Sequence, residues 1–90
     1  MLVVAVKTDA FSGEFLHKSE LPEGVLAEIR EGASGLYGEP IGILMLALLD
    51  PAKREEFEAL RLSQALKVWN TYRLARAVER DVPNVVPEGL

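Results

Sequence analysis

The longest regular pattern of apolar and polar positions runs from residue 51 to residue 80. After Pro51 this stretch contains no glycine or proline, and its apolar residues recur at spacings of three and four, which is typical of an α-helix. Asp50 can cap the start of this helix, and Pro83 disfavours helical angles in the residue before it. The pattern therefore predicts one long C-terminal helix over 51–81, about 45 Å in length.

The predicted helix has two apolar faces. The first face has Tyr72 at its edge, and its members are Phe57, Leu60, Val68, Ala75 and Val78. The second begins with apolar residues and becomes basic toward the end of the helix; its members are Leu62, Leu66, Trp69, Arg73, Arg76 and Arg80. A small domain has little chain with which to cover a long helix on both sides, and exposed apolar surface often marks an interaction site. We predict that the second face is a partner interface in which the arginines fix orientation. The alternative is a central helix covered on both faces by the rest of the chain.

The N-terminal 18 residues have the pattern of a β-hairpin. Leu2–Lys7 is rich in valine and predicts a strand, Thr8–Gly13 supplies turn residues, and Glu14–Lys18 can return as a second strand. An isolated two-stranded hairpin is only marginally stable. The hairpin must therefore pack on the helices or pair with a second copy of the chain.

Three segments fill the middle and the end of the chain. Ser19–Glu31 predicts a short helix that stops at Gly32, and 32–42 is a glycine-rich loop. Ile41–Leu49 is short and apolar, so periodicity does not distinguish a buried strand from a buried helix, but its Leu, Met and Ala content favours a helix. The tail, 82–90, is proline-rich and extended.

Together these patterns predict one small, helix-dominated α+β domain over 1–90. Its parts are a hairpin in 1–18, short helices and a glycine-rich loop in 19–50, the long helix in 51–81 and the extended tail in 82–90. The composition, with 49 % hydrophobic and 27 % charged residues, is that of an ordinary globular protein. Cysteine is absent, which excludes disulfides, a thiolate nucleophile and cysteine-ligated metals. Without a signal-peptide pattern or an apolar run of about 20 residues, we expect a cytoplasmic protein that does not enter a membrane.

Charge is unevenly distributed along the chain. Arg61–Arg80 holds five bases and one acid, a net of +4, whereas the other residues hold five bases and thirteen acids, a net of −8. This asymmetry favours pairing of the basic segment with acidic residues of the same chain, of a second copy or of an acidic protein partner. The alternative is nucleic-acid binding by Arg73, Arg76 and Arg80, against which stand the net charge of −4 and the low pI of about 4.9.

Candidate catalytic residues are few. His17 is the only histidine; no serine lies in a nucleophile-elbow motif that could join it, and no carboxylate around it has the spacing of an established metal site. The glycine-rich loop matches neither the P-loop nor the dinucleotide fingerprint. We therefore predict no catalytic, cofactor-binding or metal-binding residues. The predicted function is a non-enzymatic interaction, assembly or regulatory module that acts as a homodimer or a higher homo-oligomer.

Overall fold

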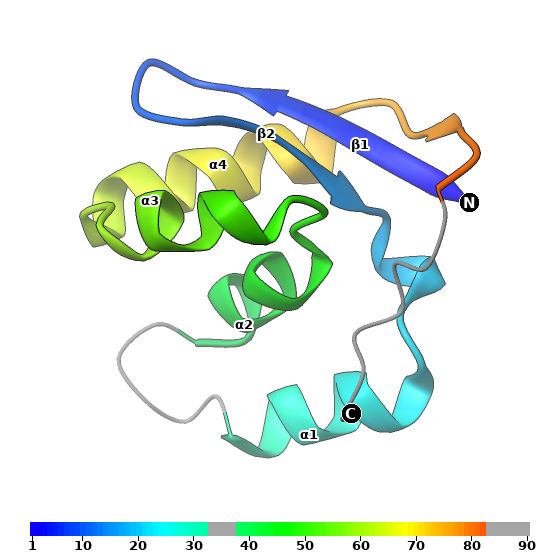
Figure 1. The fold of residues 1–90 in the computed structure, drawn as a ribbon. Helices are drawn as coiled ribbons and strands as arrows, with labels where there is room; N and C mark the ends of the chain where they lie inside the picture. The colour runs from blue at the N-terminus through cyan, green and yellow to red at the C-terminus, as the bar shows by residue number, and fades with distance from the viewer. Residues whose placement is uncertain (33–37, 83–90) are drawn as a thin grey trace.

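In the computed structural model, which describes residues 1–32 and 38–82, four α-helices pack around a three-stranded antiparallel sheet (Figure 1). The elements in chain order are β1 (Leu2–Lys7), β2 (Ser12–Leu16), the 3-10 helix η1 (Lys18–Glu20), α1 (Glu23–Gly32), α2 (Gly38–Ala47), the 3-10 helix η2 (Pro51–Lys53), α3 (Arg54–Glu58), α4 (Leu62–Leu74) and β3 (Val78–Glu79). The predicted helix-dominated α+β class is confirmed. The predicted tail beyond residue 82 lies outside the described residues.

The predicted hairpin is present as β1 and β2, which pair in antiparallel register with Val3 opposite Leu16. Its turn is closed by Thr8, whose backbone N–H donates to the Phe11 carbonyl at 2.8 Å. On the other side of β1, the two-residue strand β3 adds to the sheet in the order β2-β1-β3. The other edge of β2 forms a β-bridge between Phe15 and the segment after α2. Each strand of the hairpin therefore has a backbone partner on both edges.

The core lies between the hairpin and the helices, and Phe15 is at its centre. The ring of Phe15 is fully buried and lies within 6.3 Å, centroid to centroid, of the rings of Phe11, Phe57 and Tyr72. Fully buried Leu44 on α2 and Val68 on α4 belong to the same cluster. Figure 1 shows α4 running beneath the hairpin, so that one face of the sheet is covered by helix.

The apolar segment Ile41–Leu49 is helical over most of its length, because α2 extends to Ala47. The glycine-rich loop predicted for 32–42 is wrong for residues 38–42, which belong to α2, while 33–37 lie outside the described residues. Gly42 has a packing role in this helix. A Cβ at this position would lie 2.9 Å from Cγ2 of Ile29, so glycine permits the close approach of α1 to α2.

The single long helix predicted over 51–81 is wrong. A straight helix would separate Phe57 from Tyr72 by about 22 Å along its axis. In the structure both rings pack against the ring of Phe15, at 6.3 Å and 5.8 Å, and the longest dimension of the protein is only 31 Å. The chain therefore turns at Arg61, whose backbone is extended (φ −66°, ψ 154°), and α4 starts there in a new direction.

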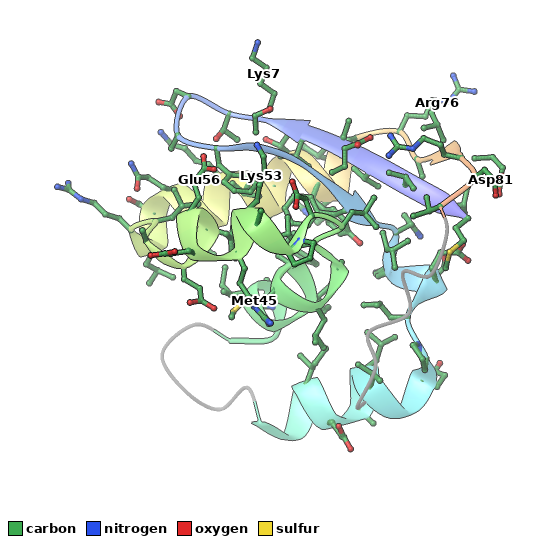
Figure 2. All side chains as sticks on the ribbon, in the orientation of Figure 1. Lys7, Met45, Lys53, Glu56, Arg76 and Asp81 are labelled. Atoms are coloured by element: carbon green, nitrogen blue, oxygen red, sulfur yellow. The ribbon has the colours of Figure 1, made fainter. Side chains whose placement is uncertain are left out.

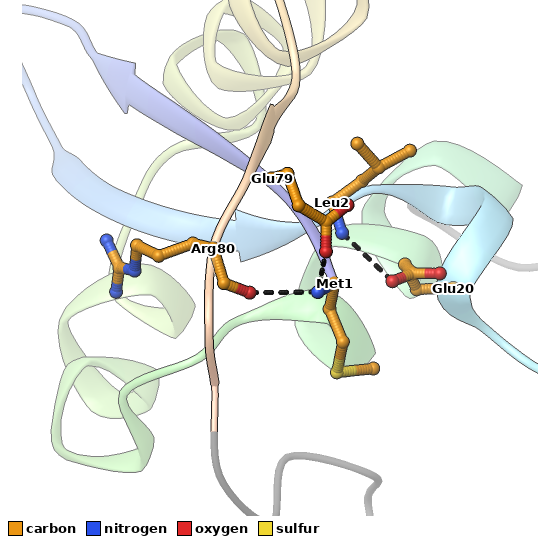
Figure 3. Close-up of polar contacts among 5 residues, drawn as sticks. All are labelled: Met1, Leu2, Glu20, Glu79 and Arg80. Carbon is orange, nitrogen blue, oxygen red and sulfur yellow. Dashed lines mark hydrogen bonds and ion pairs between the residues drawn. The ribbon is translucent and has the colours of Figure 1, made fainter.

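The end of the predicted helix is also not helical. Ala75 has an extended backbone (ψ 151°), and the chain continues to β3, which is held against the first residues of β1 (Figure 3). The Met1 ammonium donates to Oε1 of Glu79 at 2.5 Å and to the Arg80 carbonyl at 2.8 Å. The hydrogen bond from the ammonium to Glu79 raises the pKa of the Met1 amino group. The backbone of β1 thus gains a second strand partner that a continued helix could not supply.

Candidate interaction surface

The α4 stripe, which we define as Leu62, Leu66, Trp69 and Arg73, forms one row along α4. These residues are spaced at i, i+4, i+7 and i+11, and at about 100° per residue they lie within about 60° of one another around the helix axis. The core face of the same helix consists of Ala65, Val68 and Tyr72. The stripe and the core face are thus separate sides of α4, as the sequence pattern predicts.

The apolar residues of the stripe are exposed at one end and partly covered at the other. Leu62 and Leu66 are 43 % and 40 % exposed. Trp69 is half-buried: its ring stacks on that of Tyr72 at 5.5 Å and packs against the edge of the core. The two leucines are therefore available to a partner, whereas Trp69 joins the surface to the core.

An apolar cleft of about 180 Å³ adjoins the exposed end of the stripe. It lies between α2, α3 and the start of α4, and its lining residues are Ile41, Met45, Phe57, Glu58, Leu60, Leu62 and Ala65. Figure 2 shows Met45 on the side of α2 that faces α3. Because Leu62 both lines this cleft and begins the stripe, the cleft and the stripe form one continuous apolar surface.

Charged side chains stand at opposite ends of this surface. Glu58 lines the cleft beside Leu62 and makes an ion pair with Arg54 at 3.5 Å, in which both side chains are about half exposed. Such exposed pairs contribute little stability, and so the Glu58 carboxylate is free to interact elsewhere. At the other end, Arg73 is exposed and has no ion-pair partner among the described residues. The surface therefore carries a carboxylate, Glu58, in an exposed ion pair at one end, and the guanidinium of Arg73 at the other.

Arg76 and Arg80 do not continue the stripe, and this part of the predicted helical face is wrong. Both residues follow the end of α4 at Leu74, where the chain is extended. Arg80 instead makes a close ion pair with Glu14 of the hairpin. Of the three predicted orienting arginines, only Arg73 lies in line with Leu62 and Leu66.

The sequence pattern gave no indication of the cleft, because its walls come from segments far apart in the chain. Ile41 and Met45 belong to α2, whereas Phe57 and Leu60 precede the turn at Arg61. Gln64 is a weak local signal of that turn. Its Oε1 accepts a hydrogen bond from the Arg61 backbone N–H at 2.9 Å, and glutamine is a common capping residue at the third position of a helix. Arginine is not a preferred cap residue, so the pattern is easily missed.

A second, open hollow of about 420 Å³ lies between the hairpin and η2 and includes Lys7 and Lys53 in its lining (Figure 2). Three of its four charged lining residues, Glu14, Asp50 and Lys53, already have partners within the chain, and the fourth, Lys7, is exposed. The Lys53 ammonium donates to the Ser12 carbonyl and lies 5.5 Å from the centre of the Phe11 ring. This hollow is therefore less suited to binding than the surface on α4.

The described residues offer little catalytic chemistry. Nδ1 of His17 accepts from the Ser19 backbone N–H at 3.2 Å and so caps η1. Tyr72 donates its hydroxyl to the Leu16 carbonyl at 2.9 Å, and burial raises the pKa of this phenol to about 12. In the ranges 1–32 and 38–82 no three histidine or carboxylate side chains are grouped as a metal ion would require. The contacts of His17 and Tyr72 stabilise local structure.

Comparison with protein families, with curated proteins and with solved structures finds no match to this chain. Across the part of the chain that the structure describes, no helix has the length and apolar character needed to cross a membrane. The candidate functional site is the surface formed by the α4 stripe and the adjoining cleft.

Proposed function

We propose that this protein is a non-enzymatic interaction module that self-associates through the α4 stripe. The observation that carries the proposal is the exposure of Leu62 and Leu66, one helical turn apart, beside an apolar cleft. Large apolar side chains that are grouped with a cleft mark interaction sites more often than single exposed ones do. A cytoplasmic location stays a prediction from the sequence.

A second copy of the chain is the partner that fits this surface best. The surface has Glu58 at one end and Arg73 at the other, so it can be complementary to itself. A two-fold dimer uses the same patch on both subunits and is the commonest symmetric assembly. The opposite net charges of Arg61–Arg80 and of the remaining chain, +4 and −8, also favour association between copies.

The test is the molar mass in solution, measured by light scattering after size-exclusion chromatography over a dilution series. We expect a mass near twice 9.9 kDa at high concentration, which decreases on dilution. Leu66→Asp should give a folded monomer at every concentration, because it places a charge in the centre of the apolar stripe.

Leu74→Asp is the matched control. Leu74 is 77 % exposed but lies about 100° or more around the helix from the centre of the stripe, and it receives the same substitution. It should leave the mass unchanged. A wild-type monomer at millimolar concentration would overturn the proposed function, and a monomer caused by Leu74→Asp but not by Leu66→Asp would place the interface elsewhere.

Nucleic-acid binding, the alternative from the sequence, has less support. Arg73, Arg76 and Arg80 do not share one helical face, and Arg80 is paired with Glu14. Affinity for nucleic acid depends on several bases that reach phosphates together. Binding of the wild type to single- or double-stranded oligonucleotides at 150 mM salt, lost in Arg73→Ala, would reverse this preference.

A further inference from the structure

We propose that the two copies pack with their α4 helices antiparallel, so that Glu58 of each copy faces Arg73 of the other. This inference rests on the proposed self-association and names its geometry. It follows from the order of side chains along the surface, where Glu58 stands beside Leu62 and Arg73 stands eleven residues after Leu62. Leu62 and Arg73 are about 16 Å apart along α4, so Glu58 and Arg73 stand at opposite ends of the surface.

Charge decides between the two possible two-fold arrangements. With parallel helices, Glu58 would meet Glu58 and Arg73 would meet Arg73, and like charges opposite each other suppress association. With antiparallel helices, each acidic end meets a basic end, and the contact occurs twice in one dimer. The macrodipoles of two antiparallel α4 helices are also complementary at their ends.

The apolar residues fit the same register. If Leu62 of one copy lies opposite Arg73 of the other, then Leu66 lies opposite Trp69, and both pairs repeat across the two-fold axis. Leu66 would therefore bury its exposed part against the indole that stacks on Tyr72. Aromatic residues at the centre of an interface are among those whose loss most reduces affinity. The arrangement is closed, so association stops at two copies.

The test is a charge-reversal series in which the dimer dissociation constant is measured by sedimentation equilibrium at low salt. Glu58→Arg and Arg73→Glu should each raise the dissociation constant by about tenfold, because each turns two attractive contacts into repulsive ones. The double variant Glu58→Arg/Arg73→Glu should return to within about threefold of the wild type, because the charges are exchanged and again opposite. All these differences should shrink in 1 M salt.

Two matched controls receive the same charge changes outside the surface. Glu56→Arg changes an exposed residue of α3 that lies on the side away from Met45 in Figure 2, and Lys67→Glu changes an exposed residue of α4 more than a quarter turn from the stripe. Neither should alter the dissociation constant by more than about twofold. Circular dichroism of every variant, recorded when monomeric, verifies that the fold is intact.

Mixing the single variants gives an independent readout. Glu58→Arg and Arg73→Glu proteins, each weakly associated alone, should form a mixed dimer in which both contacts are attractive. A wild-type dimer that is lost in Leu66→Asp but insensitive to both single reversals would overturn the antiparallel arrangement and leave the proposed function standing. A wild type that stays monomeric would overturn the proposed function itself.

Discussion

The two sides of α4 have similar apolar content, but the side chains of one are buried and two leucines of the other are exposed. On the core face, Val68 is fully buried and Tyr72 is 4 % exposed. On the stripe, Leu62 and Leu66 remain about two-fifths exposed, although leucine is more hydrophobic than the buried tyrosine. The difference comes from what lies opposite: the hairpin and α2 cover the core face, whereas no described element covers the two leucines. Hydrophobicity along one helix therefore does not separate a core face from a binding face.

The largest expected effect is on the core face. Val68→Asp should destabilise the fold by about 3–5 kcal/mol, because it buries an unpaired carboxylate where the present side chain has no exposure. This is a large part of the stability of a small domain. Urea denaturation followed by circular dichroism measures it.

Leu66→Asp places the same residue on the stripe and is compared with Val68→Asp. Urea denaturation of both is measured at a concentration where the wild type is monomeric. There Leu66→Asp should cost at most about 1 kcal/mol, because the new carboxylate stays in water. Equal losses at the two positions would mean that the stripe is a second core face.

Trp69→Ala should have an intermediate effect, because Trp69 belongs to both sides. The variant loses the stacking on Tyr72 and part of the core packing, which lowers the unfolding free energy by about 2 kcal/mol. It also removes a side chain of the proposed interface. We expect a lower urea midpoint together with a higher dimer dissociation constant. Leu66→Ala should change only the second quantity, and a Trp69→Ala protein that matched the wild type in both would place Trp69 in neither role.

Tyr72→Phe should have the smallest effect on the unfolding free energy near neutral pH, and this effect changes with pH. Burial raises the pKa of the Tyr72 phenol from 10.0 to about 12, so between these values the folded protein holds a proton that the unfolded chain has lost. The stabilisation is complete below pH 10 and decreases as pH rises toward 12. Tyr72→Phe lacks this titration but loses a hydrogen bond to Leu16, at about 1 kcal/mol near neutral pH.

The measurement for Tyr72 is the difference in urea midpoint between wild type and Tyr72→Phe from pH 8 to pH 12. Other titrating groups, Tyr37 included, are present in both proteins, so the difference isolates Tyr72. The difference in urea midpoint should be constant below pH 10, and should then narrow and change sign before pH 12. A difference that stayed constant to pH 12 would show that the hydroxyl is not held in the core.

Local patterns predicted the elements whose partners are near in sequence. The valine-rich strand Leu2–Lys7 pairs with its neighbour across a turn that Thr8 closes, and the Leu, Met and Ala content of Ile41–Leu49 correctly favoured a helix. The separation of Val68 and Tyr72 from Leu62 and Leu66 also follows from helical spacing alone. In these cases the residues that matter are within a few positions of one another.

The long helix predicted over 51–81 failed at two places, in both of which distant residues decide the backbone. No glycine or proline closely follows Leu60 or Leu74, and the capping contact of Gln64 with Arg61 is only a weak local signal of the first break. The first break occurs because Phe57 and Tyr72 must reach the same Phe15 ring. After the second break, the chain pairs with the open side of β1 and with the Met1 ammonium. Arg76 and Arg80 moved off the predicted face for this reason.

The sequence by itself determined the helix-dominated α+β class, the excess of bases in Arg61–Arg80, and the side of one helix that Leu62, Leu66, Trp69 and Arg73 share. These properties depend on composition and on the fixed geometry of about 100° per residue. Only the tertiary structure decided where that helix begins and ends, that a cleft lies beside Leu62, and that Arg80 is paired with Glu14. The physical reason is that helix boundaries and surface exposure are set by packing between segments distant in the chain, whose free energy exceeds the small differences in local helix propensity.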